Sequence, residues 1–297
     1  MTLRLIYRPS LTPRLLSELS ALDALAEAAI RKLTRAILLL PVGLGLDQKL
    51  ATIEAAYALG DVQGVIDAIP FETMDAELGT LIKSALKETA EKAGAAEIWS
   101  RQLAGLRFDI KNPRAILWAD TRAAEQVTAV GAESRQAVRS LINQAVRDGV
   151  DARSTGRLIR EVVGLNERQV IAIANLQRKL EEDGISPARI DKLIQAASKR
   201  ALRYRAEMIA RTEIQTAQNR GQLEAWQQSA DKGLLDRARV RKVWIANVGA
   251  CPRCQAMEDA SHANPVTLEG EFTGGADAAI TPVLHPGCRC SMRLEFL

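Results

Sequence analysis

The stretch that opens with Cys251-Pro-Arg-Cys254 and closes with His285-Pro-Gly-Cys288-Arg-Cys290 contains all four cysteines and both histidines of the 297-residue chain. A unit of about sixty residues that buries little apolar surface commonly needs a metal, disulfides or a neighbouring element for stability. The pattern therefore predicts that residues 236–297 form a small, Cys/His-stapled unit at the C-terminal end.

Two segments of this unit have the composition of strands. Residues 240–248 contain Lys-Val-Trp-Ile, and Ser291 to Phe296 alternates between apolar and polar side chains. Proline and glycine recur between these segments, so we expect a loop-rich connection with little to bury. The unit is predicted to have an α+β fold.

The chain upstream of residue 236 has the composition of a helical protein. Only 4% of all residues are aromatic, alanine and leucine are abundant, and apolar residues recur at helical spacing. The ranges expected to be helical are 13–40, 47–59, 61–69, 73–93, 114–131, 133–149, 154–163, 166–182 and 187–229. We therefore expect a mainly α protein, with elongated helical N-terminal and middle regions.

Charge divides the chain into three predicted regions. Residues 1–105 carry 11 basic and 13 acidic side chains, residues 106–235 carry 22 and 16, and residues 236–297 carry seven of each. The first is expected to be a helical docking region, the second a basic helical domain, and the third the Cys/His unit. Clustered basic side chains favour non-specific contacts with double-stranded DNA.

The densest basic segment lies within the last of these helices. Its candidates for contacts with DNA phosphates are Lys199, Arg200, Arg203 and Arg205. A charged helix face is more often simply solvated. A second nucleic-acid hypothesis is a cytoplasmic DNA-binding regulator, with a helix-turn-helix around Gly164 and a zinc ribbon at the C-terminal end.

The Cys/His cluster has the layout of a two-arm metal site. A Cys-x-x-Cys arm places two thiolates on one side of a turn, and a second arm can complete a tetrahedron around Zn²⁺. Five candidates compete for four places, and the close spacing of the last two cysteines leaves room for the histidine as the fourth ligand. The candidates are Cys251, Cys254, His285, Cys288 and Cys290.

Three interpretations of this cluster remain open: a structural zinc site, disulfides formed in an oxidising setting, and unliganded thiols with His285 fixing a turn. A metal-dependent hydrolase centred on His285 and the cysteines is a further hypothesis, although no carboxylate is clearly placed as a third arm.

Two blocks, in this order along the chain, resemble the phage Mu protein F-like head morphogenesis family, the minor head proteins of tailed phages. The first is Ala210-Arg-Thr-Glu213 followed by Ala217, Asn219 and Gly221; the second comprises Val243-Trp244 and the two Cys/His arms. The similarity covers roughly residues 110–297. One departure is Met257-Glu-Asp-Ala260, where the family often carries an Asp-Gly turn.

The resemblance implies a structural, non-enzymatic protein present in multiple copies per virion. Its expected place is the head interior or the portal vertex, after assembly in the host cytoplasm, and its expected partners are the portal protein, the major capsid protein or both. Family members are thought to assist head assembly, DNA packaging or ejection.

The residues of the first block are expected to act as a scaffold rather than in catalysis. Helical spacing places Arg211, Gln215 and Asn219 in one polar stripe, and places Glu213, Ala217 and Gly221 in another whose small residues permit a close neighbour. The motif residues carried over as scaffold are Arg211, Thr212, Glu213 and Asn219. A plain amphipathic helix is the alternative.

The sequence also predicts that the protein is soluble. The N-terminal residues lack the apolar core and small-residue cleavage site of a secretory signal. The longest apolar run, residues 36–46, is interrupted by Pro41 and is far shorter than the roughly 20 residues of a membrane span. We therefore expect no membrane partner.

Overall fold

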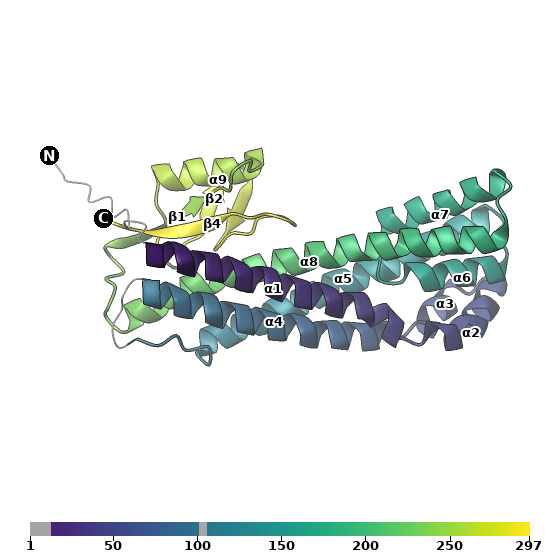
Figure 1. Cartoon of the computed structure of the whole chain (residues 1–297), viewed down its shortest axis with the longest axis horizontal. Coiled ribbons are helices and arrows are strands. Elements are labelled where there is room, and N and C mark those ends of the chain that lie inside the picture. The colour runs from purple at the N-terminus through teal and green to yellow at the C-terminus, as the bar shows by residue number, and fades with distance from the viewer. Residues whose placement is uncertain (1–12, 101–105) are drawn as a thin grey trace. The chain divides into compact units, whose positions relative to one another are not determined.

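The computed structural model describes residues 13–100 and 106–297, which form nine helices and four strands (Figure 1). The helices are α1 (Pro13–Gly43), α2 (Leu46–Ala58), α3 (Val62–Ala68), α4 (Phe71–Ser100), α5 (Pro113–Arg147), α6 (Ala152–Val162), α7 (Glu167–Glu182), α8 (Pro187–Asp231) and α9 (Pro252–Ala263). The strands are β1 (Val240–Ile245), β2 (Phe272–Gly274), β3 (Asp277–Ala279) and β4 (Ser291–Phe296). The predicted fold class, mainly α with a small α+β C-terminal unit, is confirmed.

Local sequence signals set several helix ends. The Asn166 side chain accepts a hydrogen bond from the Gln169 backbone N–H at 3.0 Å, and the Gln169 side chain accepts one from the Asn166 backbone N–H at 3.2 Å. This reciprocal capping box starts α7, as the spacing of the two residues predicts. Gly164, at φ +87°, adopts the left-handed conformation in the turn before it.

Helices α5 and α1 continue through residues that were expected to end a helix. The expected break after Gly131 is absent, because α5 is continuous from Pro113 to Arg147. A glycine costs a helix only about 1 kcal/mol, and a Cβ at Gly131 would lie 2.6 Å from Asp75 Oδ1. The glycine therefore makes room for Asp75, which forms a 2.8 Å ion pair with Arg135. Helix α1 likewise continues past Pro41 to Gly43.

The described chain forms two compact units, each assembled from separate segments. Of the described residues, unit 1 contains 13–32, 83–100, 106–120 and 208–297, and unit 2 contains 33–82 and 121–207. Helices α1, α4, α5 and α8 contribute residues to both. The three consecutive regions expected from the sequence are a different division of the chain and stay a prediction. Residues 1–12 and 101–105 of the expected N-terminal region lie outside the described residues.

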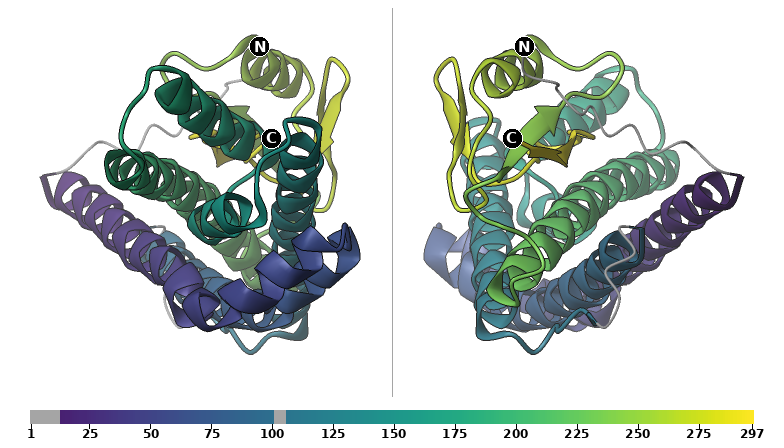
Figure 2. Two further views of the ribbon diagram at one scale, coloured as in Figure 1. Left: turned by 90° about the vertical axis from the view of Figure 1, so that its right-hand side faces the viewer. Right: turned by 90° about the vertical axis from the view of Figure 1, so that its left-hand side faces the viewer.

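Unit 1 contains the small sheet. Strands β1 and β4 pair antiparallel, from Val240 opposite Phe296 to Ile245 opposite Ser291, and lie side by side in Figure 1 and Figure 2. Strands β2 and β3 form a separate hairpin. Both predicted strands are confirmed, although β1 ends at Ile245.

The connection between these strands is more ordered than the sequence suggested. Helix α9 was not predicted, and the expectation of little to bury is wrong, because Met257, Leu268 and Phe272 are at most 1% exposed. They share one core with Trp226 of α8 and Trp244 of β1. The Trp244 and Phe272 rings meet edge to face at 5.4 Å.

Membrane-spanning potential is limited in the described residues. No single helix there combines the length and apolar character of a span, although the bent pair Ala24–Gly43 and Leu46–Ala58 passes that test jointly.

Candidate metal centre and its helical support

The first arm of the Cys/His cluster is built on the start of α9. Cys251 is the N-cap residue of this helix and Pro252 follows as the first helical residue, the position that proline favours. The nearby backbone N–H of Cys254 is the largest of several influences that together lower the pKa of the Cys251 thiol to about 7. The helix start thus stabilises a thiolate at Cys251.

The second arm is a tight turn from His285 to Cys288. The Cys288 backbone N–H donates to the His285 carbonyl oxygen at 3.1 Å. Gly287 has a φ of +75° after Pro286, the combination that a type II turn requires. This turn places the His285 and Cys288 side chains three residues apart at its two ends.

The two arms meet around Cys254. The His285 Nε2 atom lies 3.2 Å from Cys251 Sγ and 3.4 Å from Cys254 Sγ. Cys254 Sγ in turn lies 3.6 Å from Cys288 Sγ. The ligand atoms form two groups that share Cys254, one with Cys251 and His285 and one with Cys288 and Cys290. The structure therefore places the five predicted candidates in two adjoining groups of three rather than in one set of four.

Three of the cluster's four thiols are buried. Cys254, Cys288 and Cys290 are at most 5% exposed. Removal from water raises the pKa values of the Cys254 and Cys290 thiols, so these sulfurs remain protonated near neutral pH in the absence of a cation. A coordinated divalent cation reverses this preference, because thiol ligands bind as thiolates. A closed set of sulfur and imidazole donors can hold such an ion.

Helix α8 supports the second arm through the polar stripe that the sequence predicted. The Asn219 side-chain amide donates to the carbonyl oxygens of Pro282 and Cys290, both at 3.0 Å. The Gln215 amide donates to the same Cys290 carbonyl at 3.4 Å. Thr212 Oγ1 accepts a hydrogen bond from the Gly287 N–H at 3.1 Å. The helix therefore fixes the backbone on both sides of the ligand-bearing turn.

The other motif residues also occupy structural positions. Arg211 forms a 3.1 Å ion pair with Glu27 of α1, and Glu213 is 1% exposed. A Cβ at Gly221 would lie 2.2 Å from the Ala90 carbonyl oxygen. The small residue thus permits close contact between α8 and α4, as the predicted small-residue stripe requires.

The basic candidates do not form one surface. Lys199, Arg200 and Arg203 are exposed on the part of α8 that belongs to unit 2. Arg205 is 6% exposed and forms a 2.9 Å ion pair with Glu133. Its predicted role in phosphate contact needs correction, because its guanidinium is directed into unit 2 rather than toward solvent.

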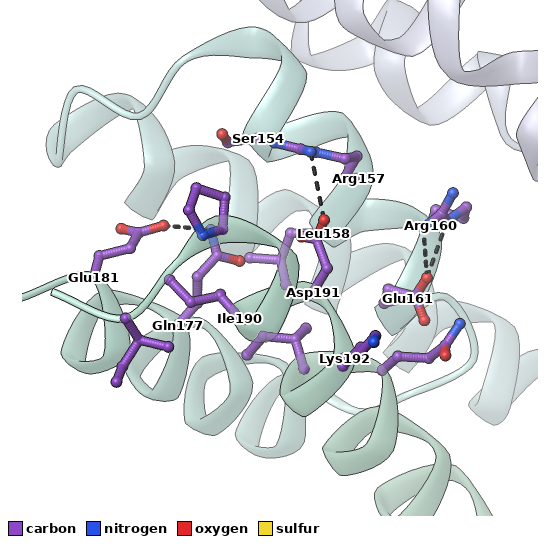
Figure 3. Close-up of a pocket in the computed structure, with 14 residues that line it drawn as sticks. Ser154, Arg157, Leu158, Arg160, Glu161, Gln177, Glu181, Ile190, Asp191 and Lys192 are labelled. Carbon is purple, nitrogen blue, oxygen red and sulfur yellow. Dashed lines mark hydrogen bonds and ion pairs between the residues drawn. The ribbon is translucent and has the colours of Figure 1, made fainter. Parts of the chain in front are cut away.

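The predicted helix-turn-helix segment corresponds to α6 and α7 of unit 2. A cavity of about 350 Å³ lies between α6, the end of α7 and the start of α8 (Figure 3). Arg157 and Arg160 line it. Arg157 forms an ion pair with Asp191 at 3.6 Å, and Arg160 forms one with Glu161 at 2.8 Å. Both arginines are thus paired with carboxylates, and the DNA-reading role stays a prediction.

Sequence reasoning missed the burial of Lys242. Lys242 of β1 is fully buried, its Nζ donates to the Ile280 carbonyl oxygen at 2.6 Å, and it lies 4.9 Å from the centre of the Phe272 ring. Burial, followed by the positive charge of Arg220, lowers the Lys242 pKa to about 7. Side chains two residues apart share one face of a strand, so the positions of Val240 and Trp244 were the signal that Lys242 faces the core.

Comparison with protein-family models, with curated proteins and with solved structures finds no match for the chain.

Proposed function

We propose that the chain is a structural minor head protein of a tailed phage, acting at or near the portal in head assembly, DNA packaging or ejection. The observation that supports this proposal most is that the two sequence blocks behind the resemblance meet in unit 1. Asn219 of the first block holds the Cys290 carbonyl of the second, and Thr212 holds Gly287. Residues about seventy positions apart in the sequence are thus in direct contact through hydrogen bonds.

We further propose that Zn²⁺ occupies the Cys/His cluster as a structural ion. Structural zinc sites are closed by four protein ligands, whereas catalytic sites keep a position for water or substrate. Five donors gather at this cluster, enough to fill all four positions of a tetrahedron. When bound, the ion would cross-link α9 to the turn that α8 supports.

The proposed partners are the portal protein, the major capsid protein or both, with residues 1–105 as the docking region. The test is cross-linking of the full chain to assembled portal rings with a lysine-specific reagent, followed by mass spectrometry. Lys49, Lys87 and Lys92 report on residues 1–105, whereas Lys179, Lys192 and Lys199 report on the middle region.

The expected result is a stable complex with a defined number of chains per ring and cross-links concentrated in residues 1–105. If the chain associates neither with portal rings nor with procapsids, the proposed head role is overturned. Stable association through the middle region instead would overturn the assignment of the docking region alone.

Packaged DNA is a further proposed partner. The exposure of Lys199, Arg200 and Arg203 supports non-specific contact with the phosphate backbone. A regulator would instead prefer one sequence over the electrostatic background, so competition between unrelated duplexes distinguishes the two functions.

A further inference from the structure

The two arms of the cluster have the same spacing. Cys251 and Cys254 stand three residues apart at the start of α9, and His285 and Cys288 stand three residues apart across the glycine turn. Each arm therefore presents two donors from a tight backbone segment. Cys290 adds a fifth donor only two residues after Cys288.

The ring of His285 is oriented for binding through Nε2. Its Nδ1 atom lies 3.0 Å from the Pro286 carbonyl oxygen, so Nδ1 carries the hydrogen and donates it. The Nε2 lone pair then faces the Cys251 and Cys254 sulfurs. A hydrogen bond from the second ring nitrogen to a carbonyl is the usual support of a metal-bound histidine.

Three separations within the cluster are close to the edges of a mixed sulfur and nitrogen tetrahedron. With Zn–S near 2.3 Å and Zn–N near 2.0 Å, a tetrahedron places two sulfurs about 3.8 Å apart and a sulfur and a nitrogen about 3.5 Å apart. The two sulfur–nitrogen distances to His285 are 3.2 and 3.4 Å, and the Cys254–Cys288 sulfur distance is 3.6 Å. The first two edges belong to the compact group of Cys251, Cys254 and His285, and the third joins Cys288 to that group through Cys254 alone.

Cys290 has a different attachment. Its backbone carbonyl receives hydrogen bonds from Asn219 and Gln215 of α8. The next residue, Ser291, starts β4 and pairs with Ile245 of β1. These contacts hold the Cys290 backbone at the junction between helix and sheet, while its sulfur lies in one group with those of Cys254 and Cys288.

We propose that the metal ligands are Cys251, Cys254, His285 and Cys288, a set of three thiolates and one imidazole for a soft divalent cation, and that Cys290 is a supporting core thiol outside this set. The assignment rests on the proposed structural metal, but it does not depend on the proposed phage role. It selects one of the several four-ligand sets that five donors allow.

The test is X-ray absorption spectroscopy of the zinc-loaded full chain, combined with the absorption spectrum of the cobalt-substituted protein. We expect three sulfurs at about 2.3 Å and one nitrogen at about 2.0 Å. The Cys290→Ser variant is expected to bind one ion per chain with the same spectra. A four-sulfur shell in the unaltered protein, or one sulfur fewer in Cys290→Ser, would overturn the assignment.

A zinc competition titration against a chelator provides the second measurement. His285→Ala is expected to weaken zinc binding at least about tenfold, because it removes a ligand. His262→Ala is the matched control, since His262 is exposed at the end of α9, and its affinity should not change. Equal affinity in His285→Ala and the unaltered chain would overturn the role of His285.

These measurements separate the two proposals. Suppose that the metal has three sulfur ligands and one nitrogen ligand, but the chain binds neither portal rings nor procapsids. The ligand set would then stand and the head role would be overturned. A four-sulfur site in a chain that binds the portal would overturn only the ligand set.

Discussion

Thr212 on α8 accepts a hydrogen bond at 3.1 Å from the backbone N–H of Gly287, which follows it by 75 residues. The same hydroxyl donates to the Met208 carbonyl oxygen at 2.8 Å, one turn earlier in the helix. One side chain therefore connects a long helix to the turn that carries His285 and Cys288. The contact explains why a threonine in the first sequence block matters to a cluster in the second.

Replacement of Thr212 by valine should destabilise the Cys/His unit by about 1 kcal/mol, because the Gly287 N–H loses its acceptor while the side-chain shape is kept. Thr216→Val is the matched control. Thr216 is also half-buried on α8, and its hydroxyl donates to the Thr212 carbonyl oxygen of the same helix. Urea unfolding and hydrogen exchange at Gly287 provide the measurement. Equal effects of the two variants would contradict the proposed connection.

Gly221→Ala should destabilise unit 1 by about 3 kcal/mol, because the new methyl group would meet the Ala90 backbone. A backbone obstacle cannot rotate away as a side chain can. Gly43→Ala is the control, since a Cβ there meets nothing within 4 Å. Thermal unfolding of both variants tests the prediction, and a stable Gly221→Ala protein would show that α8 and α4 are not in close contact.

Periodicity and capping residues made most of the helices predictable. The Asn166 and Gln169 pair marks the start of α7, and leucine and alanine spacing identifies α8 over nearly its full length. The continuation of α5 through Gly131 was not predictable. It depends on Asp75, which is distant in sequence and needs the space that the glycine leaves. Local sequence shows only the cost of a glycine in a helix.

The C-terminal unit was predictable in chemistry but not in packing. The spacing of cysteine and histidine gave the donor set, and the alternation in residues 291–296 gave β4. Helix α9 was missed because its Cys-Pro start was read only as a metal-binding turn, although proline after an N-cap residue is also a helix signal. The burial of Arg205 depends on the distant partner Glu133, which no local pattern indicates, whereas strand spacing places Lys242 on the face of Val240 and Trp244.

The stability of unit 1 should rise with pH above neutrality because of Lys242. Its folded-state pKa is about 7 and its ordinary value is 10.5, so between these values the unfolded chain binds a proton that the folded chain does not. Stability should therefore increase by up to about 1.4 kcal/mol per pH unit in this window and level off below it.

Lys242→Met should remove this contribution and raise stability at pH 7. Urea unfolding from pH 6 to pH 10, at one fixed metal content, compares the variant with the unaltered chain. In the unaltered chain, Arg220 lowers the Lys242 pKa and Glu271 raises it. A difference between the two proteins that does not change with pH would contradict the burial of an uncharged Lys242.

Alanine at Lys199, Arg200 and Arg203 together should weaken binding to double-stranded DNA and make it less dependent on salt. Loss of three phosphate contacts lowers the slope of log K against log salt by about 2.7. The control replaces Arg31, Lys32 and Arg35, which are exposed on α1 and change the net charge equally. Filter binding at several salt concentrations provides the slopes. Equal slopes in the two triple variants would argue against DNA contact through α8.

Metal content and hydrogen exchange, measured on one preparation made without added zinc, test the structural role of the Cys/His cluster most directly. We expect close to one zinc ion per chain. A chelator should accelerate amide exchange throughout β1, α9 and β4, and leave exchange in α6 and α7 of unit 2 unchanged. The account would be contradicted if the purified chain contained no metal. It would also be contradicted if the C-terminal unit kept the same protection from exchange after the ion was removed.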